Sequence, residues 1–393
     1  MSNTVVVAGV GMTRFFKPSE SPRYTELGAD AVRMALADAH LDYAAVQQAH
    51  VGYVYGDSTC GQRALYGVGM SGIPIVNVNN NCSTGSTALW LARNAIRAGQ
   101  AECVLALGFE QMQPGALVEH WQDRPGPLDE FVRAATEAAF DPGAPMAPMM
   151  FGGAGIEHQK RWGTKDETFA MIRAKASRHA VHNERAIFRK EVSVDDVMAS
   201  PHVTKLLTRL QCCPPTCGAA AAILCTPEFA RRHGIDARVT IAAQAMTTDM
   251  PSTFEAHDLM RVVGYDMTAA AARAVYAEAG IGPDDVDVAE MHDCFTANEL
   301  ISYEGLGFCP EGGAEKFIVD GDNSYGGKVV TNPSGGLLSK GHPLGATGLA
   351  QCFELTGQLR GQMGPRQVEG ARVALQHNLG LGGACVVTLY RAG

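Results

Sequence analysis

The chain repeats one helix-turn-strand pattern, and this repeat limits the folds that it can adopt. Residues 26–54 run from an Ala-rich amphipathic helix through a polar turn into an apolar strand, and residues 267–293 do the same. A second match pairs the helix and strand that follow Cys82 with residues 341–380. Two similar α/β halves packed about a pseudo-twofold axis are the simplest account of both matches.

Short apolar strands alternate with helices in each half. We expect strands at 5–11, 50–56, 73–79 and 103–110, with a helix at 26–39. This alternation predicts an α/β fold whose parallel strands are buried on both faces. The stretch from about 113 to 200 is richer in Pro, Met, Trp, His and charge, which indicates an insertion over the sheet. The predicted division is 1–118 for the first part of the N-terminal half, 119–200 for an inserted loop domain, 201–257 for the rest of that half and 258–393 for the C-terminal half.

Composition excludes several classes of function. Hydrophobic residues make up 46% and charged residues 19% of the chain, enough for a substantial core. The net charge of −9 argues against nucleic acid or an anionic membrane as the main partner. We expect no membrane span and no signal peptide, because Met1–Thr4 lead straight into a short strand-like segment. Scattered cysteines and the absence of a Ser-Lys-Leu ending favour a reducing, cytoplasmic location.

Cys82 lies just before a helical pattern, in the sequence N-C-S-T-G. Ser83, Thr84 and Ser86 offer N-cap oxygens, and the free N–H groups of a helix start favour a thiolate. Taken alone, Cys82 also fits a buried structural cysteine. In the repeated pattern His342 occupies the matching helix start, and packing of the two halves would bring these starts together. We therefore interpret Cys82 as reactive.

Three further segments place reactive or Gly-rich residues after strands. They are M-H-D-C-F at 291–295, the Gly-rich block at 332–348 and H-N-L-G-L-G-G-A-C at 377–385. Open α/β sheets bind ligands at such strand ends. A single histidine such as His292 is more often structural, but a histidine beside Cys82 would supply the base that an active thiol needs.

The cluster Cys212, Cys213 and Cys217 has the spacing of metal ligands only in part. No fourth Cys or His follows at a matching distance, and the two prolines between them favour a turn. We predict no metal site.

Together these motifs resemble the thiolase superfamily. N-C-S-T-G-S, G-H-P-L-G-A-T-G and the Gly-rich end carry the resemblance, and M-H-D-C-F, H-N-L-G-L-G-G-A and V-G-Y-V-Y-G-D-S-T-C-G-Q-R narrow it to the sterol-carrier-protein type. The resemblance implies a thiolase fold, with two half-domains in a five-layered αβαβα arrangement and a loop domain. It also implies a homodimer or a dimer of dimers.

The resemblance also implies catalytic roles. Cys82 would be the nucleophile that attacks a 3-oxoacyl-CoA, and His342 would take its proton. Other thiolases carry a second cysteine in C-x-G, where this chain has Asn378-Leu379-Gly380, so Cys294 of H-D-C-F takes the acid/base role. His292 and His342 would donate to the thioester oxygen, and the N–H groups of Cys82 and Gly380 would surround the keto oxygen. We interpret Cys385 as structural. No permanently bound cofactor is implied, and CoA is a substrate.

Basic residues of the insertion are candidates for the CoA phosphates. They are clustered in an acidic protein, although each one singly also fits a solvated helix face. The candidates are Lys160, Arg161, Arg173, Lys175 and Arg178.

The main hypothesis is a degradative thiolase of fatty-acid, branched-chain or sterol side-chain oxidation. One alternative is a thiolase-like aldolase on steroid CoA esters, which we expect to lack the catalytic cysteines. A condensing enzyme shares the mechanism in reverse. A non-catalytic lipid- or CoA-binding protein would bind acyl-CoA without acylating Cys82.

Overall fold

The computed structural model describes residues 4–113, 120–138 and 143–393. Within these ranges ten strands form one sheet in the order β3-β2-β4-β5-β1-β6-β10-β9-β7-β8. The strands are β1 (Val5–Met12), β2 (Gln48–Gly52), β3 (Ile75–Val78), β4 (Cys103–Glu110), β5 (Gly218–Cys225), β6 (Val239–Thr247), β7 (Val288–Glu290), β8 (Val330–Thr331), β9 (Val373–Gly380) and β10 (Ala384–Ala392).

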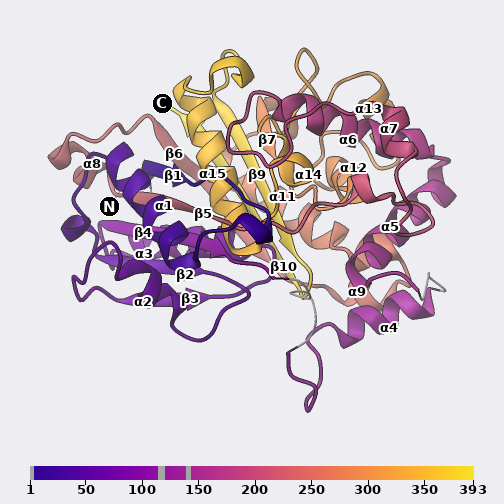
Figure 1. The fold of residues 1–393 in the computed structure, drawn as a ribbon. Helices are drawn as coiled ribbons and strands as arrows, with labels where there is room; N and C mark the ends of the chain where they lie inside the picture. The colour runs from indigo at the N-terminus through magenta and orange to yellow at the C-terminus, as the bar shows by residue number, and fades with distance from the viewer. Residues whose placement is uncertain (1–3, 114–119, 139–142) are drawn as a thin grey trace.

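The strand order confirms the two similar halves. Read inward from the two outer edges, β3-β2-β4-β5-β1 and β8-β7-β9-β10-β6 follow the same pattern, with the same parallel and antiparallel partners. The halves join where β1 pairs antiparallel with β6 (Figure 1). The range 201–257, expected to complete the first half, therefore divides. Strand β5 of this range belongs to the first half. Strand β6 pairs with β10, and it occupies in the second half the position that β1 occupies in the first.

The helices cover the sheet in layers. They are α1 (Tyr24–Asp38), α2 (Cys60–Leu65), α3 (Thr84–Arg97), α4 (Asp129–Glu137), α5 (Met146–Trp162), α6 (Asp166–Ala180), α7 (Val194–Met198), α8 (Pro227–His233), α9 (Pro251–Glu255), α10 (Leu259–Val262), α11 (Tyr265–Ala279), α12 (Thr296–Gly305), α13 (Ala314–Val319), α14 (Gly336–Ser339) and α15 (Leu344–Arg360). Short 3-10 helices lie at Pro18–Glu20, Tyr43–Ala45, Arg209–Gln211, Pro283–Asp285 and Gly364–Arg366.

The central layer consists of α3 and α15, which pack against each other and against strands of both halves, while α1 and α11 cover the outer faces. The strands of the two halves belong to one sheet, but they form separate layers on either side of α3 and α15. With α1 and α11 outside, this is the expected five-layered αβαβα arrangement. Glycines allow the central contact: a Cβ added at Gly108 would lie 2.1 Å from the Gly345 carbonyl oxygen, and one at Gly85 would lie 2.7 Å from the same atom. The two helix starts are therefore held close together, as the repeat predicts.

The inserted segment packs on the second half. In Figure 1 the helices α4 to α7 lie together on the right, away from α2 and β3 on the left. Helices α5 and α6 contact α12, and apolar residues of the insertion share one core with those of the second half. In the described residues we find no helix long and apolar enough to cross a membrane.

Candidate active site

Loops from both halves bring the predicted reactive residues into one place. Cys82 comes just before α3, His342 just before α15, and His292 follows β7. One ligand-type atom of each, the thiol sulfur and one ring nitrogen per histidine, all lie within 4.8 Å of one another. The two imidazole rings stand edge to face with centroids 5.1 Å apart. The placement predicted for these three residues is therefore confirmed.

Sulfur and imidazole nitrogen are also the atoms that bind zinc in proteins. This trio is therefore the place in the described residues where a metal would be sought. The predicted absence of a metal site stays a prediction.

Cys82 lies one residue before the N-cap of α3. Both the capping of the helix and the pKa of the thiol differ from the expected ones. Ser83 is the N-cap, but its hydroxyl donates to the Asn80 carbonyl and caps no helix N–H. Burial, followed by the negative charge of Glu110, raises the pKa of the Cys82 thiol to about 12. The expectation of a thiolate stabilised by the helix start needs correction, because burial favours the neutral form of this thiol. The resting thiol is neutral and needs a base.

The two histidines are buried and neutral. Burial, then the charge of Lys340, lowers the pKa of His342 to about 3. Burial, then the nearby rings of His342 and His377, lowers the pKa of His292 well below its usual value. The Nδ1 atom of His342 lies 2.7 Å from Thr347 Oγ1, and that of His292 lies 3.0 Å from Asn378 Nδ2. Each ring therefore has its Nε2 atom left for chemistry, and Nε2 of His342 is buried with no hydrogen-bond partner among the described residues.

Cys294 is buried beside this group. Burial raises the pKa of its thiol well above the usual value, and the nearby thiols of Cys213 and Cys82 raise it further. The Cys213 N–H donates to the Cys294 carbonyl at 2.9 Å. Sequence reasoning missed Cys213, because the two prolines after it indicated only a turn. An antiparallel β-bridge between Cys212 and Phe295 holds the segment that contains Cys213 beside Cys294.

Gly380 ends β9 and lies against the backbone of Cys82. A Cβ at this position would lie 2.4 Å from the Asn80 carbonyl oxygen and 3.1 Å from the Cys82 nitrogen. Only glycine permits so close an approach. The amide groups named for the second oxyanion hole are thus neighbours, while their catalytic role stays a prediction.

Glu110 is a second residue that sequence reasoning missed. It ends β4, is fully buried, and accepts hydrogen bonds from the N–H groups of Val54, Tyr55 and Gly345. Burial raises its pKa to about 7. The Glu110 side chain therefore links the backbone of Val54 and Tyr55, in the loop after β2, to the start of α15. An acidic residue ending an apolar strand was the only sequence signal for it.

The predicted CoA-phosphate residues separate into two groups. Arg173 and Lys175 are 3% and 2% exposed, and their partners are Ser339 for Arg173 and Glu299 for Lys175. For these two the prediction needs correction, because their charged ends face the interior of the protein. Three candidates remain on the surface: Lys160, Arg161 (paired with Asp258 at 2.9 Å) and Arg178.

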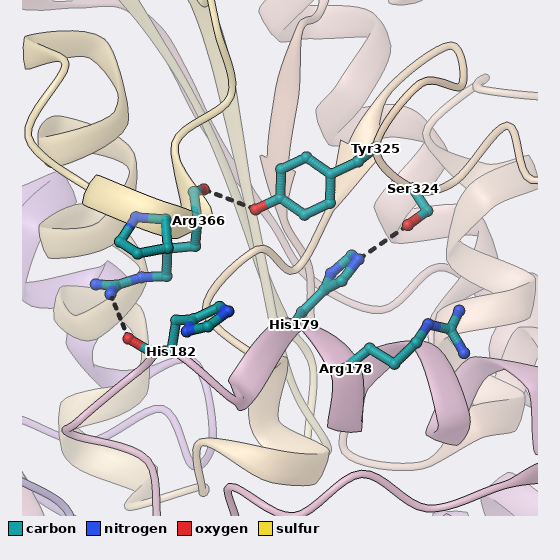
Figure 2. A pocket seen from close by; sticks show the side chains of 7 residues that line it. Arg178, His179, His182, Ser324, Tyr325 and Arg366 are labelled. Atoms are coloured by element: carbon teal, nitrogen blue, oxygen red, sulfur yellow. Dashed lines mark hydrogen bonds between the residues drawn. The ribbon is translucent and has the colours of Figure 1, made fainter.

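Arg178 lines a surface pocket of about 280 Å³. Figure 2 shows its side chain beside that of His179, whose ring bonds to Ser324 at 2.9 Å. The other lining residues are His182, Tyr325, Pro365 and Arg366. None of the residues named for catalysis lines this pocket. Arg178 is thus a weaker candidate than its place in the basic cluster suggested.

The fold is the thiolase fold. The family model "Thiolase, N-terminal domain" matches residues 5–227, and "Thiolase C-terminal domain-like" matches residues 246–389. The chain belongs to this family.

Its relatives include sterol carrier protein 2 of Rattus norvegicus, which is 56% identical over 99% of this chain and 72% of that protein. Two solved structures share the fold over 99% of this chain and 98% of theirs. They are the Ltp2-ChsH2(DUF35) aldolase, with a TM-score of 0.83 at 22% identity, and human mitochondrial 3-ketoacyl-CoA thiolase, with 0.74 at 16% identity. The predicted resemblance to sterol-carrier-protein-type thiolases is confirmed.

Proposed function

We propose that this protein is a degradative thiolase. It would cleave a 3-oxoacyl-CoA with CoA to give acetyl-CoA or propionyl-CoA and a shortened acyl-CoA. Substrates would come from fatty-acid, branched-chain or sterol side-chain oxidation. The observation that carries this proposal is the group of one neutral thiol and two neutral imidazoles within 4.8 Å. The sterol carrier protein 2 relatives support the same class.

The first half-reaction forms an acyl-enzyme. The Cys82 sulfur attacks the keto carbon while His342 takes the thiol proton, because thiol and imidazole are both neutral at rest. Donors around the keto oxygen stabilise the charge that develops there. The bond between the α-carbon and the keto carbon then breaks, and its electron pair forms the enolate of acetyl-CoA or propionyl-CoA. Cys294 gives that α-carbon a proton.

The second half-reaction returns the enzyme to its starting state. The Cys294 thiolate takes the proton of incoming CoA, whose sulfur attacks the acyl group on Cys82. Release of the shortened acyl-CoA leaves the Cys82 sulfur as a thiolate, which regains its proton from His342. Atoms and protons then balance without a redox partner. Lys160, Arg161 and Arg178 are the surface residues proposed to meet the CoA phosphates.

We also propose a homodimer, alone or as part of a dimer of dimers. Strand β3 forms one outer edge of the sheet, and unpaired strand edges readily pair with another chain. Three apolar side chains near this edge are exposed: Tyr66 at 53%, Met70 at 83% and Val76 at 42%. An apolar patch beside a free edge suits a second copy of this chain. A reducing, cytoplasmic location is proposed on the unpaired cysteines alone.

Mass spectrometry separates the proposal from its alternatives. The intact protein is incubated with a long-chain 3-oxoacyl-CoA without CoA, and peptides are searched for an acyl group on Cys82. A thiolase acquires the adduct and releases it when CoA is added, whereas a non-catalytic binding protein acquires none. Cys385→Ala is the matched control, because this buried thiol hydrogen-bonds to Thr268 at 3.7 Å and is expected to leave acylation unchanged.

The aldolase alternative rests on no more than a shared fold, because the Ltp2-ChsH2(DUF35) aldolase is 22% identical to this chain. It is tested by following the release of cleavage products from a steroid CoA ester that has a 3-hydroxy side chain. Cleavage of that ester by a Cys82→Ala protein would contradict the thiolase mechanism. A panel of short, long, branched and steroid 3-oxoacyl-CoAs, measured in both directions, then separates the degradative role from a condensing role.

A further inference from the structure

A chain of buried hydrogen bonds ends on the ring of His292. Tyr390 Oη lies 2.5 Å from Gln376 Oε1, and Gln376 Nε2 lies 2.6 Å from Ser86 Oγ. Ser86 Oγ is 2.8 Å from Asn378 Oδ1, whose Nδ2 lies 3.0 Å from His292 Nδ1. Tyr390, Gln376, Ser86 and Asn378 are fully buried, and His292 is 1% exposed. Solvent therefore does not offer these groups other partners.

The direction of this chain is set at Gln376. Its Nε2 also lies 2.8 Å from the Gly348 carbonyl oxygen, which can only accept a hydrogen bond. The amide nitrogen of Gln376 therefore faces both Gly348 and Ser86, and Ser86 Oγ accepts from it. The single hydroxyl proton of Ser86 is then left for Asn378 Oδ1.

Asn378 passes this direction on to the histidine. With Oδ1 accepting from Ser86, its Nδ2 faces His292 and donates. The opposite orientation of the amide would point Nδ2 at Ser86 Oγ, which already accepts from Gln376, and would leave the serine proton without an acceptor. Buried polar groups in proteins are rarely left in that state. The observed contacts thus favour one orientation of both amides.

We infer that Ser86, Gln376 and Asn378 are positioning residues that hold His292 in one tautomer, with Nδ1 unprotonated and the proton on Nε2. The neutral ring has one N–H, and the chain directs it to the atom that is left for chemistry. This inference deepens the proposed function, because it makes His292 a fixed donor for the enolate oxygen. The resting tautomer itself does not depend on which reaction the enzyme catalyses.

The second imidazole lacks such a constraint. His342 Nδ1 contacts Thr347 Oγ1, which also lies 3.0 Å from the Pro343 carbonyl oxygen. That carbonyl already accepts from two backbone N–H groups, those of Ala346 and Thr347. The threonine proton is therefore free to point to either neighbour, and His342 can exchange between accepting and donating at Nε2. This freedom suits a residue that must take and return a proton.

Nitrogen NMR of the resting protein tests the tautomer directly. The full chain is prepared with ¹⁵N-histidine, and the ring signals of His292 are identified by their loss in a His292→Gln spectrum. We expect a protonated Nε2 and an unprotonated Nδ1 from neutral to mildly alkaline pH. A protonated Nδ1 in the wild-type protein would overturn the inference, whether or not thiolysis is observed.

Two variants then test the chain that sets it. Ser86→Ala frees the Asn378 amide to turn, and Asn378→Leu removes the donor to Nδ1, so both are expected to give mixed tautomers. Loss of the oriented donor should lower kcat by about 100- to 1,000-fold in Asn378→Leu, and by less in Ser86→Ala, with a smaller change in KM.

Ser302→Ala, another buried serine on a helix, is the matched control and is expected to keep both the tautomer and kcat. Wild-type NMR signals for His292 in a correctly folded Asn378→Leu protein would overturn the positioning role. A fall in activity with unchanged tautomer would do the same. An inactive wild-type enzyme with the expected tautomer would reject the proposed function and leave this inference standing.

Discussion

The two halves share one topology but carry different chemistry at matching positions. The loop before α3 supplies the Cys82 thiol, and the loop before α15 supplies the His342 imidazole. Likewise β4 ends at Glu110, which ties loops together, while the matching β9 ends at Gly380, which lets the Cys82 loop approach. The duplication thus brings equivalent strand ends to one place, and each half has specialised. In the proposed mechanism, one half supplies the nucleophile and the other supplies the groups that move protons.

The largest effect is expected when either helix start loses its reactive group. Cys82→Ala should lower thiolysis by at least about 10⁴-fold, because the nucleophile and its base act as a unit. His342→Ala should fall in the same range, and the double variant should be no slower than the slower single one. Acetyl-CoA release, followed by chromatography, measures all three. Independent, additive losses would show that the matching positions do not cooperate.

Cys294→Ala tests the division of work inside the second half. Removal of the acid/base thiol should lower turnover by about 100- to 10,000-fold, the usual contribution of a positioned proton carrier. Acylation of Cys82 should be partly retained, because attack on the keto carbon does not use this thiol. Single-turnover mass spectrometry separates the two steps. Unchanged turnover would remove Cys294 from the mechanism.

Glu110 should make the stability of the first half depend on pH. Its pKa in the folded protein is raised from 4.5 to about 7 by burial, so the folded state holds this proton more tightly than the unfolded state. Unfolding therefore becomes easier as the pH rises from about 4.5 to about 7. The full effect is about 3 kcal/mol, from the 1.36 kcal/mol that corresponds to each pH unit.

Glu110→Gln removes this proton and is the comparison. As the pH rises from about 4.5 to about 7, the Tm of the wild type should fall relative to the Tm of Glu110→Gln. The shift is measured by calorimetry in matched buffers. A Tm difference that is constant from pH 4.5 to 7.5 would contradict the raised pKa.

The contact between the halves should tolerate no added atoms. Gly108→Ala places a Cβ 2.1 Å from the backbone oxygen of Gly345, so we expect a loss of about 1–3 kcal/mol in the free energy of unfolding. Gly282→Ala is the matched control, because its nearest neighbour would lie 3.9 Å away. Denaturant titration compares the two. Equal stability of both variants would mean that the central layer can shift to accept the methyl group.

Much of the fold was predictable, because the hydrophobic periodicity of each segment indicates its helix or strand and the internal repeat indicates the two halves. The strand at 103–110 was predicted to the residue, and the helices beginning near residues 26 and 267 were predicted to within a turn. The meeting of Cys82 with His342 followed from the two halves. By contrast, the start of α3 was expected to lower the thiol pKa, and burial reversed that effect.

What the sequence determined by itself was the pattern of buried faces, the pairing of the two halves and the residue types at the strand ends. Hydrophobic period and motif spacing carry that information along the chain. Only the tertiary structure decided which charges are buried, as for Lys175 against Glu299, and which way the amide of Asn378 points. Both depend on partners far away in the chain, because burial sets the free energy of a charge and distant acceptors set the direction of a hydrogen bond.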